Sequence, residues 1–501
     1  MASTVTGTMS APTEAKLSNR KGKKRVVILG SGWAGYAFAR TLDPSKYERI
    51  MVSPRSYFVF TPLVAGTAVG TLEFRAVIES VRKLHLDHYH QGWADNIDFG
   101  RKLVRVEANT SDDLTSRTTT TTTTTREKGS VFDVPYDKLV IAVGAYSQTF
   151  GIQGVKEHAH FLRDVGDARK IRMKILQCFE KASLPVTTDA ERRKLLHFAV
   201  VGGGPTGIEF AAELHDLVRD DLRRIYPDLV ARFVRITVYD VAPKVLPMVL
   251  PMFDQKLAQY AMDVFKRERI AVKTEHHLTR IRPDDDCTGC LKLRFKEYGD
   301  EEEIGAGIVV WSTGLMQNPL IQKLATAEVT ESLSSSTEEV MSSAAMRLQS
   351  DEKTGGLVTD SHLRVMTVPH SQGAPGGADQ KNSTSILPDV YTIGDCAVVA
   401  GQRYPATAQV ASQQATYLAK QINKDGDANA KPFRFRNWGV MTYLGGWRAI
   451  HQSSADELTG RAAWFLWRTA YLTKSMSIRN KIMVPVYWAI SFLFGRDVSR
   501  F

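Results

Sequence analysis

The stretch from Arg25 to Arg40, RVVILGSGWAGYAFAR, constrains the fold more than any other part of the chain. Its early residues, Val26–Leu29, form an apolar, β-branched-rich run that predicts a buried strand. A Gly-x-Gly-x-x-Gly pattern follows and leads directly into a helix-compatible segment. In this pattern Gly30 allows a tight turn, Gly32 lets the backbone approach a pyrophosphate, and Gly35 lets helix and strand pack closely. The N-terminus of the helix would offer unpaired N–H groups to the phosphates.

The same pattern occurs a second time. An apolar run, Leu195–Val201, is followed by the six residues Gly202–Gly207 and by a helix-compatible segment that starts at Ile208. A duplicated protein with a single cofactor is one interpretation, but two different dinucleotides are the favoured one. A flavin dinucleotide bound beside a nicotinamide dinucleotide is typical of an electron-transfer enzyme. The sequence therefore predicts an α/β fold with two Rossmann-type dinucleotide-binding domains.

Composition narrows the class of protein. The 501 residues are enough for two or three domains with full cores. A net charge of +11 and a pI near 9.3 favour anionic partners such as nucleotides, anionic lipid or nucleic acid. Four cysteines argue against a secreted disulfide framework and for a reducing compartment. The longest nearly apolar run, Ile482–Phe494, contains a proline and a serine and is too short to span a bilayer.

The residues at the ends of two predicted strands differ in a way that bears on the ligands. The strand Tyr47–Ser53 ends in Ser53-Pro54-Arg55, where a ribose-binding acid would be usual. The strand Ile236–Tyr239 does end in an acid, Asp240. A carboxylate there accepts hydrogen bonds from ribose hydroxyls and repels a 2′-phosphate, so it favours NADH over NADPH. The alternative is an ordinary aspartate at a strand end.

Apolar runs and turn-forming residues predict the remaining helices, strands and loops. Helices are expected at 166–184, at Leu214–Arg232 and from about Thr407, and 326–356 and 369–385 are expected to be loops. The aromatic stretch Ser56–Leu63 would lie beside the flavin, as core packing or as part of its site. Further strands are expected at Leu103–Val106 and Lys138–Val143, at Ile308–Gly314, which closes the second domain, and at Val390–Asp395 with Asp395 at its tip. The tract Thr118–Thr125 is of low complexity and is expected to be a disordered insertion.

Cys287-Thr288-Gly289-Cys290 is the one Cys-x-x-Cys pattern in the chain. It could be a redox pair or half of a zinc site, but no second pair or nearby His pair completes a metal site. Because it follows three aspartates and lies between two predicted strands, we interpret it as an exposed, solvated hairpin turn. No metal site is predicted.

The last seventy residues change character. Aromatic residues such as Trp464, Trp467 and Phe492 alternate with arginines and lysines, and Asp497 is the only acid after Arg461. Apolar faces with basic flanks are what a pair of interfacial helices needs on an anionic bilayer surface. A docking or dimerisation segment is the alternative.

These observations divide the chain into five regions. Residues 1–24 are basic and are expected to be a disordered tail or a weak targeting segment. The other regions are a FAD-binding part (25–165, with an insertion at 110–130), an NADH-binding domain (166–320), a second FAD-binding part (321–430) and a membrane-surface and dimerisation region (431–501).

With both patterns placed, the chain resembles the type II (alternative) NADH:ubiquinone oxidoreductases, most of all the fungal and plant mitochondrial members. The segments that match include Ile28–Trp33, Ser53–Phe58, Val200–Glu209, Ala406–Ala411 and Phe494–Asp497. The resemblance implies hydride transfer from NADH to non-covalent FAD and two-electron transfer to ubiquinone, without proton pumping. It also implies a peripheral position on the mitochondrial inner membrane, a homodimer and no nucleic-acid partner.

The resemblance also assigns residues. It implies catalytic roles for three of them: Glu209 as proton relay or nicotinamide-positioning residue, and Gln409 and Gln413 beside the quinone. It implies FAD binding by Gly30, Ser31, Gly32, Trp33, Ala34, Gly35, Ser53, Pro54, Arg55, Thr61, Pro62, Ala142, Gly144, Asp395, Ala408 and Gln409. It implies NADH binding by Gly202, Gly203, Gly204, Pro205, Thr206, Gly207, Glu209, Asp240, Thr313 and Gly314.

The chain departs from the family pattern at some positions, and other classes of enzyme are considered as alternatives. Ser412 replaces the histidine of some mitochondrial members, and no EF-hand pattern is present, so calcium control is not expected. A flavin-dependent disulfide reductase or a sulfide:quinone reductase would need cysteines at the flavin, and the first domain has none before Cys178. A reductase similar to apoptosis-inducing factor, with a DNA-binding basic surface, is the remaining alternative.

Overall fold

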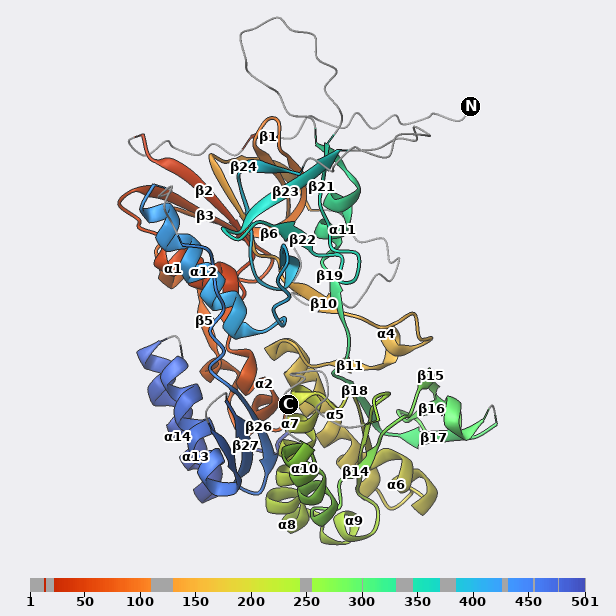
Figure 1. The fold of residues 1–501 in the computed structure, drawn as a ribbon. Helices are drawn as coiled ribbons and strands as arrows, with labels where there is room; N and C mark the ends of the chain where they lie inside the picture. The colour runs from red at the N-terminus through yellow and green to blue at the C-terminus, as the bar shows by residue number, and fades with distance from the viewer. Residues whose placement is uncertain are drawn as a thin grey trace, which may run out of the picture.

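The computed structural model describes residues 13–14, 22–109, 129–243, 255–299, 301–329, 346–369, 384–425, 431–453, 456–475 and 477–500. The threonine tract Thr118–Thr125 and most of the N-terminal tail lie outside these residues. Two α/β domains lie one above the other, and a pair of C-terminal helices lies at the side of the lower domain (Figure 1). The predicted class, two dinucleotide-binding domains and a C-terminal region, is confirmed.

The upper domain is built on a large sheet whose centre is parallel. β2 (Lys24–Leu29) pairs with β3 (Tyr47–Ser53) on one side and with β9 (Lys138–Ile141) on the other, and β24 (Ser385–Thr392) follows β9. Val26–Leu29 are fully buried, as expected for a strand that is covered on both faces. Helix α1 (Trp33–Thr41) and helix α12 (Ala408–Asn423) pack against each other beside this sheet (Figure 1).

Shorter elements complete the upper domain. The segment 326–356 was predicted to be a loop, and that prediction is wrong at two short edge strands, Glu328–Val329 and Met346–Leu348. Leu348 is buried, and its strand pairs antiparallel with β23 (Arg364–Pro369). The elements are β1 (Thr13–Glu14), β4 (Tyr57–Val59), α2 (Val64–Ala68), β5 (Ile78–Ser80), β6 (His88–Asp98), β7 (Leu103–Ala108), β8 (Val131–Pro135), α11 (Pro319–Thr326), β20 (Glu328–Val329), β21 (Met346–Leu348), β22 (Leu357–Thr359), β23 (Arg364–Pro369) and β25 (Ala397–Val399), with 3-10 turns at Thr61–Leu63, Phe74–Ala76, Val81–Leu84 and Gly394–Cys396.

The lower domain has a parallel sheet of five strands in the order β11-β18-β12-β13-β14. The strands are β11 (His160–Phe161), β12 (His197–Val201), β13 (Arg235–Tyr239), β14 (Ala271–Lys273) and β18 (Ile308–Trp311). The helices are α4 (Val155–His158), α5 (Val165–Ser183), α6 (Asp189–Leu195), α7 (Pro205–Leu217) and α10 (Gln255–Arg267). An antiparallel sheet of β15 (Leu278–Pro283), β16 (Leu291–Phe295) and β17 (Glu303–Ala306), with a 3-10 turn at Lys296–Tyr298, extends from this domain.

The separate helix predicted at Leu214–Arg232 is wrong in its boundaries. Leu214 belongs to α7, which continues through a π-helical turn (Val218–Leu222) into α8 (Arg223–Ile225), and a short α9 (Pro227–Arg232) follows. The break falls at Tyr226, whose φ of −124° and ψ of 60° are not helical. The physical reason is Pro227, because a proline disfavours helical dihedrals in the residue before it.

The chain passes between the two domains along a pair of adjacent strands. β10 (Ala145–Ser147) leads down and β19 (Leu315–Gln317) leads back, and the two pair antiparallel with Tyr146 opposite Met316. This ribbon is one connection between the domains; the chain also passes from α12 of the upper domain to β26 (Val440–Gly445) beside the lower one (Figure 1).

The C-terminal region packs on α7 of the lower domain. It contains β26 (Val440–Gly445), β27 (Arg448–Gln452), β28 (Glu457–Thr459), α13 (Gly460–Lys474) and α14 (Ile478–Phe494). The predicted helix pair is therefore confirmed. Of the helices in the described part of the chain, none combines the length and hydropathy needed to cross a bilayer.

Candidate functional site

The first glycine turn has the geometry that the sequence predicts. Gly30 has a φ of +104°, and a Cβ there would lie 2.3 Å from the carbonyl oxygen of Ala142. A Cβ on Gly35 would lie 1.9 Å from the carbonyl oxygen of Gly30, so only glycine lets α1 start this close to β2. No atom lies within 4 Å of the Cβ position of Gly32. That space beside the start of α1 is where a dinucleotide pyrophosphate would fit.

Polar contacts hold the surroundings of this turn. Ser31 Oγ lies 2.8 Å from Ser53 Oγ, and Trp33 Nε1 donates to Thr61 Oγ1 at 2.9 Å. Arg55 pairs with Asp164 at 2.5 Å. The serine pair joins the end of this strand to the glycine turn through two neutral hydroxyls. Two other residues predicted for FAD lie next to these contacts without taking part in them. Pro54 follows Ser53 directly, and Pro62 lies in the turn Thr61–Leu63.

A second segment of the chain closes against the start of α1. Gly394 has a φ of +80°, and a Cβ there would lie 3.2 Å from Ala34 Cβ. The next residue, Asp395, is desolvated, which raises the pKa of its carboxyl although Arg163 opposes the shift. Of the other predicted residues, Ala142 and Gly144 follow β9 directly and Ala408 is the first residue of α12. The five segments that the sequence predicted for FAD (30–35, 53–62, 142–144, 395 and 408–409) therefore lie around the first turn.

Gln414 was missed in the sequence. It is 2% exposed and its Oε1 accepts a hydrogen bond from the backbone N–H of Gly394 at 2.7 Å. The available signal was its position on the buried face of the same helix as Gln409 and Gln413. Gln414 fixes the turn that carries Asp395.

The second glycine turn repeats the first. Gly202 has a φ of +114°, a Cβ on Gly207 would lie 2.0 Å from the carbonyl oxygen of Gly202, and the Cβ position of Gly204 is open. Pro205 is the first residue of α7 and Thr206 is exposed. On the far side, the Cβ position of Gly202 is 2.9 Å from Thr313 Cβ, which places the end of β18 against the turn.

Asp240 and Gly314 flank this second turn. The carboxylate of Asp240 accepts hydrogen bonds from the backbone N–H groups of Gly203 and of Ala242, the latter at 2.7 Å. The acid at the strand end is thus tied to the glycine turn by the protein's own backbone, and its contact with a ribose stays a prediction. Gly314 has a φ of +75°, and a Cβ there would lie 2.8 Å from the ring of Phe150.

Glu209 lies on α7 but faces the C-terminal region. Its Oε1 accepts hydrogen bonds from the backbone N–H of Tyr443 at 3.1 Å and from Trp467 Nε1 at 3.3 Å. Burial raises the pKa of Glu209 to about 8, because no cation is among its contacts to favour the charged form. A carboxyl with a pKa of about 8 is mostly protonated at neutral pH.

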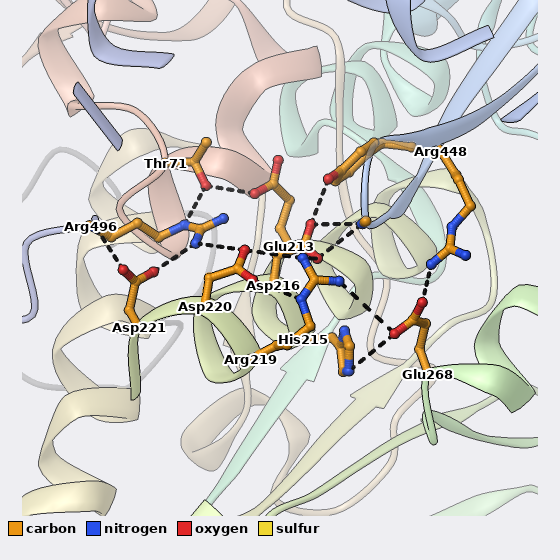
Figure 2. Close-up of polar contacts among 12 residues, drawn as sticks. Thr71, Glu213, His215, Asp216, Arg219, Asp220, Asp221, Glu268, Arg448 and Arg496 are labelled. Carbon is orange, nitrogen blue, oxygen red and sulfur yellow. Dashed lines mark hydrogen bonds and ion pairs between the residues drawn. The ribbon is translucent and has the colours of Figure 1, made fainter. Parts of the chain in front are cut away.

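One turn further along α7, a network of charged residues joins the helix to two other parts of the chain (Figure 2). Glu213 accepts a hydrogen bond from Thr71 Oγ1 at 2.7 Å, and Thr71 in turn accepts one from Arg496 Nε at 3.0 Å. Arg496 also pairs with Asp221 at 2.7 Å. The residues after α14 are therefore held on both the lower domain and the loop after α2.

The other half of the network contacts the β26–β27 hairpin. Asp216 accepts hydrogen bonds from the Tyr443 hydroxyl at 2.5 Å and from the Gly446 N–H at 3.0 Å. Arg448 pairs with Glu268, which also lies near His215 and Arg219 (Figure 2). None of these contacts was predicted. The acids at 209, 213 and 216, spaced along one helical face, were the available signal.

Gln409 and Gln413 both bind the backbone of the segment before β26. Gln409 Nε2 donates to the Gly439 carbonyl at 2.7 Å and its Oε1 accepts from the Trp438 N–H at 3.2 Å. Gln413 makes the same pair of contacts with Arg436, at 2.8 and 2.9 Å. The two amides therefore hold residues 436–439 against α12.

The cysteine pair was predicted to lie in an exposed, solvated turn, and that prediction is wrong. Cys287 and Cys290 do lie in the turn between β15 and β16, but they are 1% and 2% exposed and are joined by a disulfide. The reason is that α5 covers the turn: Lys174 Nζ donates to the carbonyl oxygen of Gly289 at 2.7 Å. Among the described residues, no group of three His, Cys, Asp or Glu is placed to hold a metal ion.

The C-terminal helices expose an unusual number of large apolar side chains. The most exposed are Phe465, Ile478, Ile482, Phe492, Leu493 and Phe494, all at least 60% accessible. Trp467 and Trp488 face inward instead, and the guanidinium of Arg468 lies 4.2 Å from the ring centroid of Trp488. The pair thus has one buried face and one apolar face open to its surroundings.

Comparisons with known proteins agree with this geometry. Residues 24–343 match the family model described as pyridine nucleotide-disulphide oxidoreductase, and residues 438–497 match the NDH2 C-terminal domain. A probable NADH dehydrogenase of Dictyostelium discoideum is 36% identical, with 95% of this chain and 91% of that protein covered. The chain belongs to the type II (alternative) NAD(P)H–ubiquinone oxidoreductases.

A second relative supports this assignment, and a solved structure shows the same fold. The external alternative NAD(P)H-ubiquinone oxidoreductase B3, mitochondrial, of Arabidopsis thaliana is 34% identical, with 95% of this chain and 90% of that protein covered. The structure of NDH2 from Plasmodium falciparum in complex with NADH has a TM-score of 0.75 at 24% identity and covers 95% of this chain and 100% of that one. The family predicted from the sequence motifs is confirmed, and FAD, the cofactor expected for it, fits the first turn.

Proposed function

We propose that this chain oxidises NADH bound at the second glycine turn and reduces ubiquinone, with FAD held at the first. The observation that carries the proposal is the pair of equivalent turns, each with open space at its middle glycine, in one chain that ends in an exposed apolar helix pair. When bound, FAD supplies the chemistry: it accepts a hydride from NADH and passes two electrons to a quinone.

The protein's own residues bind, orient and hold protons. The first turn, the Ser53-Pro54-Arg55 segment and Asp395 position one dinucleotide, and the second turn with Asp240 positions the other. The carboxyl of Glu209 holds a proton at neutral pH and is buried between α7 and α13. Gln409 and Gln413 fix residues 436–439 as a wall beside α12, where the quinone would enter.

We also place the enzyme on a membrane surface through residues 461–501. A helix pair with an apolar exposed face and basic flanks binds an anionic interface without crossing it. The mitochondrial names of several relatives favour the mitochondrial inner membrane, and the same helices are the natural place for a homodimer contact.

The reaction is tested by steady-state turnover of the purified holoenzyme. Initial rates with NADH and with NADPH are measured against a short-chain ubiquinone and against a soluble dye. The proposal predicts fast NADH turnover with both acceptors and weaker NADPH turnover. Dye reduction without quinone reduction would overturn the choice of acceptor.

The membrane contact is tested by substitution rather than by truncation. Deleting 461–501 would also remove Trp467 from Glu209 and Arg496 from Asp221, so it would damage the lower domain. Phe465→Asp with Ile482→Asp changes only exposed positions. We expect this variant to lose vesicle binding and quinone reduction while keeping NADH oxidation by the dye, and unchanged flotation on anionic vesicles would contradict the proposal.

A further inference from the structure

Phe150 is a large apolar residue that stays in contact with solvent where the chain enters the lower domain. The residue is 58% exposed. It lies three residues after the end of β10, the strand that leads down from the upper domain (Figure 1). A single exposed apolar residue needs no explanation by itself. What gives the Phe150 ring a role is its position beside the second glycine turn.

The backbone of Phe150 adopts a conformation that bulky side chains rarely take. Its φ is +52°, in the left-handed region, where a Cβ is crowded by the following carbonyl oxygen. Two hydrogen bonds hold the turn in place. Trp311 Nε1 donates to the carbonyl oxygen of Gln148 at 2.9 Å, and the Gln148 N–H donates to the carbonyl oxygen of Gly314 at 3.3 Å. Strained residues that their surroundings hold in this way are found preferentially at functional sites.

The ring of Phe150 packs close to the second glycine turn. Gly314 lies just after β18, and a Cβ on it would be 2.8 Å from two atoms of the Phe150 ring. One residue earlier, Thr313 Cβ lies 2.9 Å from the Cβ position of Gly202, the first glycine of the turn. Two adjacent residues, Thr313 and Gly314, therefore separate the Phe150 ring from the glycine turn.

The order of the strands indicates which edge of the lower sheet binds the dinucleotide. β12 pairs in parallel with β13 on one side and with β18 on the other, so the carboxyl ends of the three strands meet at one edge. The chain goes from β12 to β13 first and only later reaches β18, so the strand order reverses at β12. In such sheets ligands bind outside the carboxyl ends of the strands at this point. The glycine turn and the Phe150 ring both lie at that edge.

On the proposed assignment, the two halves of NADH extend in opposite directions from the glycine turn. Asp240, at the end of β13, would hold the adenosine ribose, and the start of α7 would hold the pyrophosphate. The nicotinamide half must then extend the other way, past the end of β18. The same direction leads along the ribbon of β10 and β19 towards the upper domain, where FAD would lie (Figure 1).

We propose that Phe150 contacts the nicotinamide half of bound NADH, with its ring against the nicotinamide riboside. The ring offers an apolar aromatic face to the uncharged dihydronicotinamide and its ribose, and removal of this exposed surface from water favours the complex. Phe150 was not among the residues predicted from the sequence for NADH. The inference rests on the proposed function, and it adds a residue that holds the reactive end of the substrate while Asp240 holds the other end.

The test uses the full-length holoenzyme and a substitution that removes the ring. Phe150→Ala should raise the apparent Kd for NADH about tenfold, which corresponds to about 1.4 kcal/mol. This Kd is obtained from the dependence of the rate of anaerobic flavin bleaching on NADH concentration. ADP contains the adenosine and both phosphates but no nicotinamide riboside, so it should compete with NADH equally well in the wild type and in the variant.

Two further variants separate a contact with the substrate from a structural effect. Phe150→Tyr keeps the ring and should have an affinity for NADH close to that of the wild type. Ile225→Ala removes an exposed apolar side chain from α8 of the same domain and is the matched control. An unchanged Kd for NADH in Phe150→Ala, or equal weakening of NADH and ADP, would overturn the contact. Failure of the proposed function would be seen in the wild type instead, because NADH would not bleach its flavin, and the inference would fall with it.

Discussion

The two glycine turns are nearly the same in backbone geometry, and what differs is the helix that each one starts. The third glycines, Gly35 and Gly207, would bring a Cβ to 1.9 and 2.0 Å from the carbonyl of the first glycine. Beyond that point the helices diverge. Counting from the third glycine, Glu209 of α7 occupies the position of Ala37 in α1. The first helix packs within its own domain, whereas the second carries buried acids against the C-terminal region.

The difference separates a resident cofactor from an exchanging substrate. The first turn is closed by Gly394 and Asp395, which lie in the 3-10 turn just after β24 of the same sheet as β2. The second turn has an exposed Thr206 at the start of its helix, and its helix leans on residues that also form the proposed membrane region. On the proposed assignment, the first turn would enclose FAD within its own domain, whereas the second turn would place NADH next to a helix that contacts the C-terminal region.

The largest effects on ligand binding should come from the third glycines. Gly35→Ala places a Cβ on the Gly30 carbonyl, and overpacking of this kind costs about 1–3 kcal/mol, or roughly fivefold to 150-fold in affinity. We expect purified Gly35→Ala to have lost most of its FAD, and Gly207→Ala to keep FAD but need a much higher NADH concentration. Flavin absorbance and the KM for NADH measure the two outcomes. Loss of flavin in both variants would break the comparison.

The ion pair between Arg496 and Asp221, just after the end of α14, should have a large effect on the free energy of unfolding. Arg496→Leu leaves Asp221 buried without its cation, and removing one partner of a buried pair costs about 3–5 kcal/mol. We expect a clear fall in the urea midpoint, with Arg500→Leu, an exposed arginine four residues later, as the control. Equal midpoints for the two variants would show that the network does not hold α7.

Glu209 should make stability depend on pH. The pKa of Glu209 is raised from 4.5 to about 8, so the folded protein keeps a proton that the unfolded chain releases. The stability from this group is complete below pH 4.5 and is lost as the pH rises towards 8, by about 1.4 kcal/mol per pH unit at most. Unfolding of the wild type and of Glu209→Gln, measured between pH 5 and pH 9, should diverge with rising pH. Parallel curves would mean that Glu209 is ionised throughout.

The smallest effect concerns Asp240. Asp240→Asn removes the charge that would repel a 2′-phosphate, and we expect the ratio of kcat/KM for NADPH to that for NADH to rise about tenfold, or 1.4 kcal/mol. Asp228→Asn, an exposed acid on α9, is the matched control. An unchanged ratio would leave Asp240 with only its hydrogen bonds to Gly203 and Ala242.

The sequence predicted what depends on local pattern. Glycine spacing and apolar runs placed both turns and both parallel sheets, because Gly30 and Gly202 need conformations that few other residues adopt. The helix pair was predicted from the density of aromatic and basic residues. These features are determined within short stretches of chain.

Contacts between distant segments could not be read in this way. Thr71, Glu213 and Arg496 come together only when the loop after α2, the helix α7 and the chain end meet, and no local pattern encodes that meeting. Likewise, burial of Cys287 and Cys290 depends on α5 covering the hairpin, although three aspartates beside them suggested exposure. The break at Pro227 was available in the sequence and was overlooked.

The most direct test of the account follows the flavin absorbance of the wild type in two anaerobic mixing steps. NADH is added first, and a short-chain ubiquinone is added once the absorbance has stopped falling. The account predicts rapid bleaching at a rate that saturates with NADH, followed by full recovery of the absorbance on addition of ubiquinone. Bleaching that ubiquinone does not reverse would contradict the proposed function while leaving both dinucleotide sites in place.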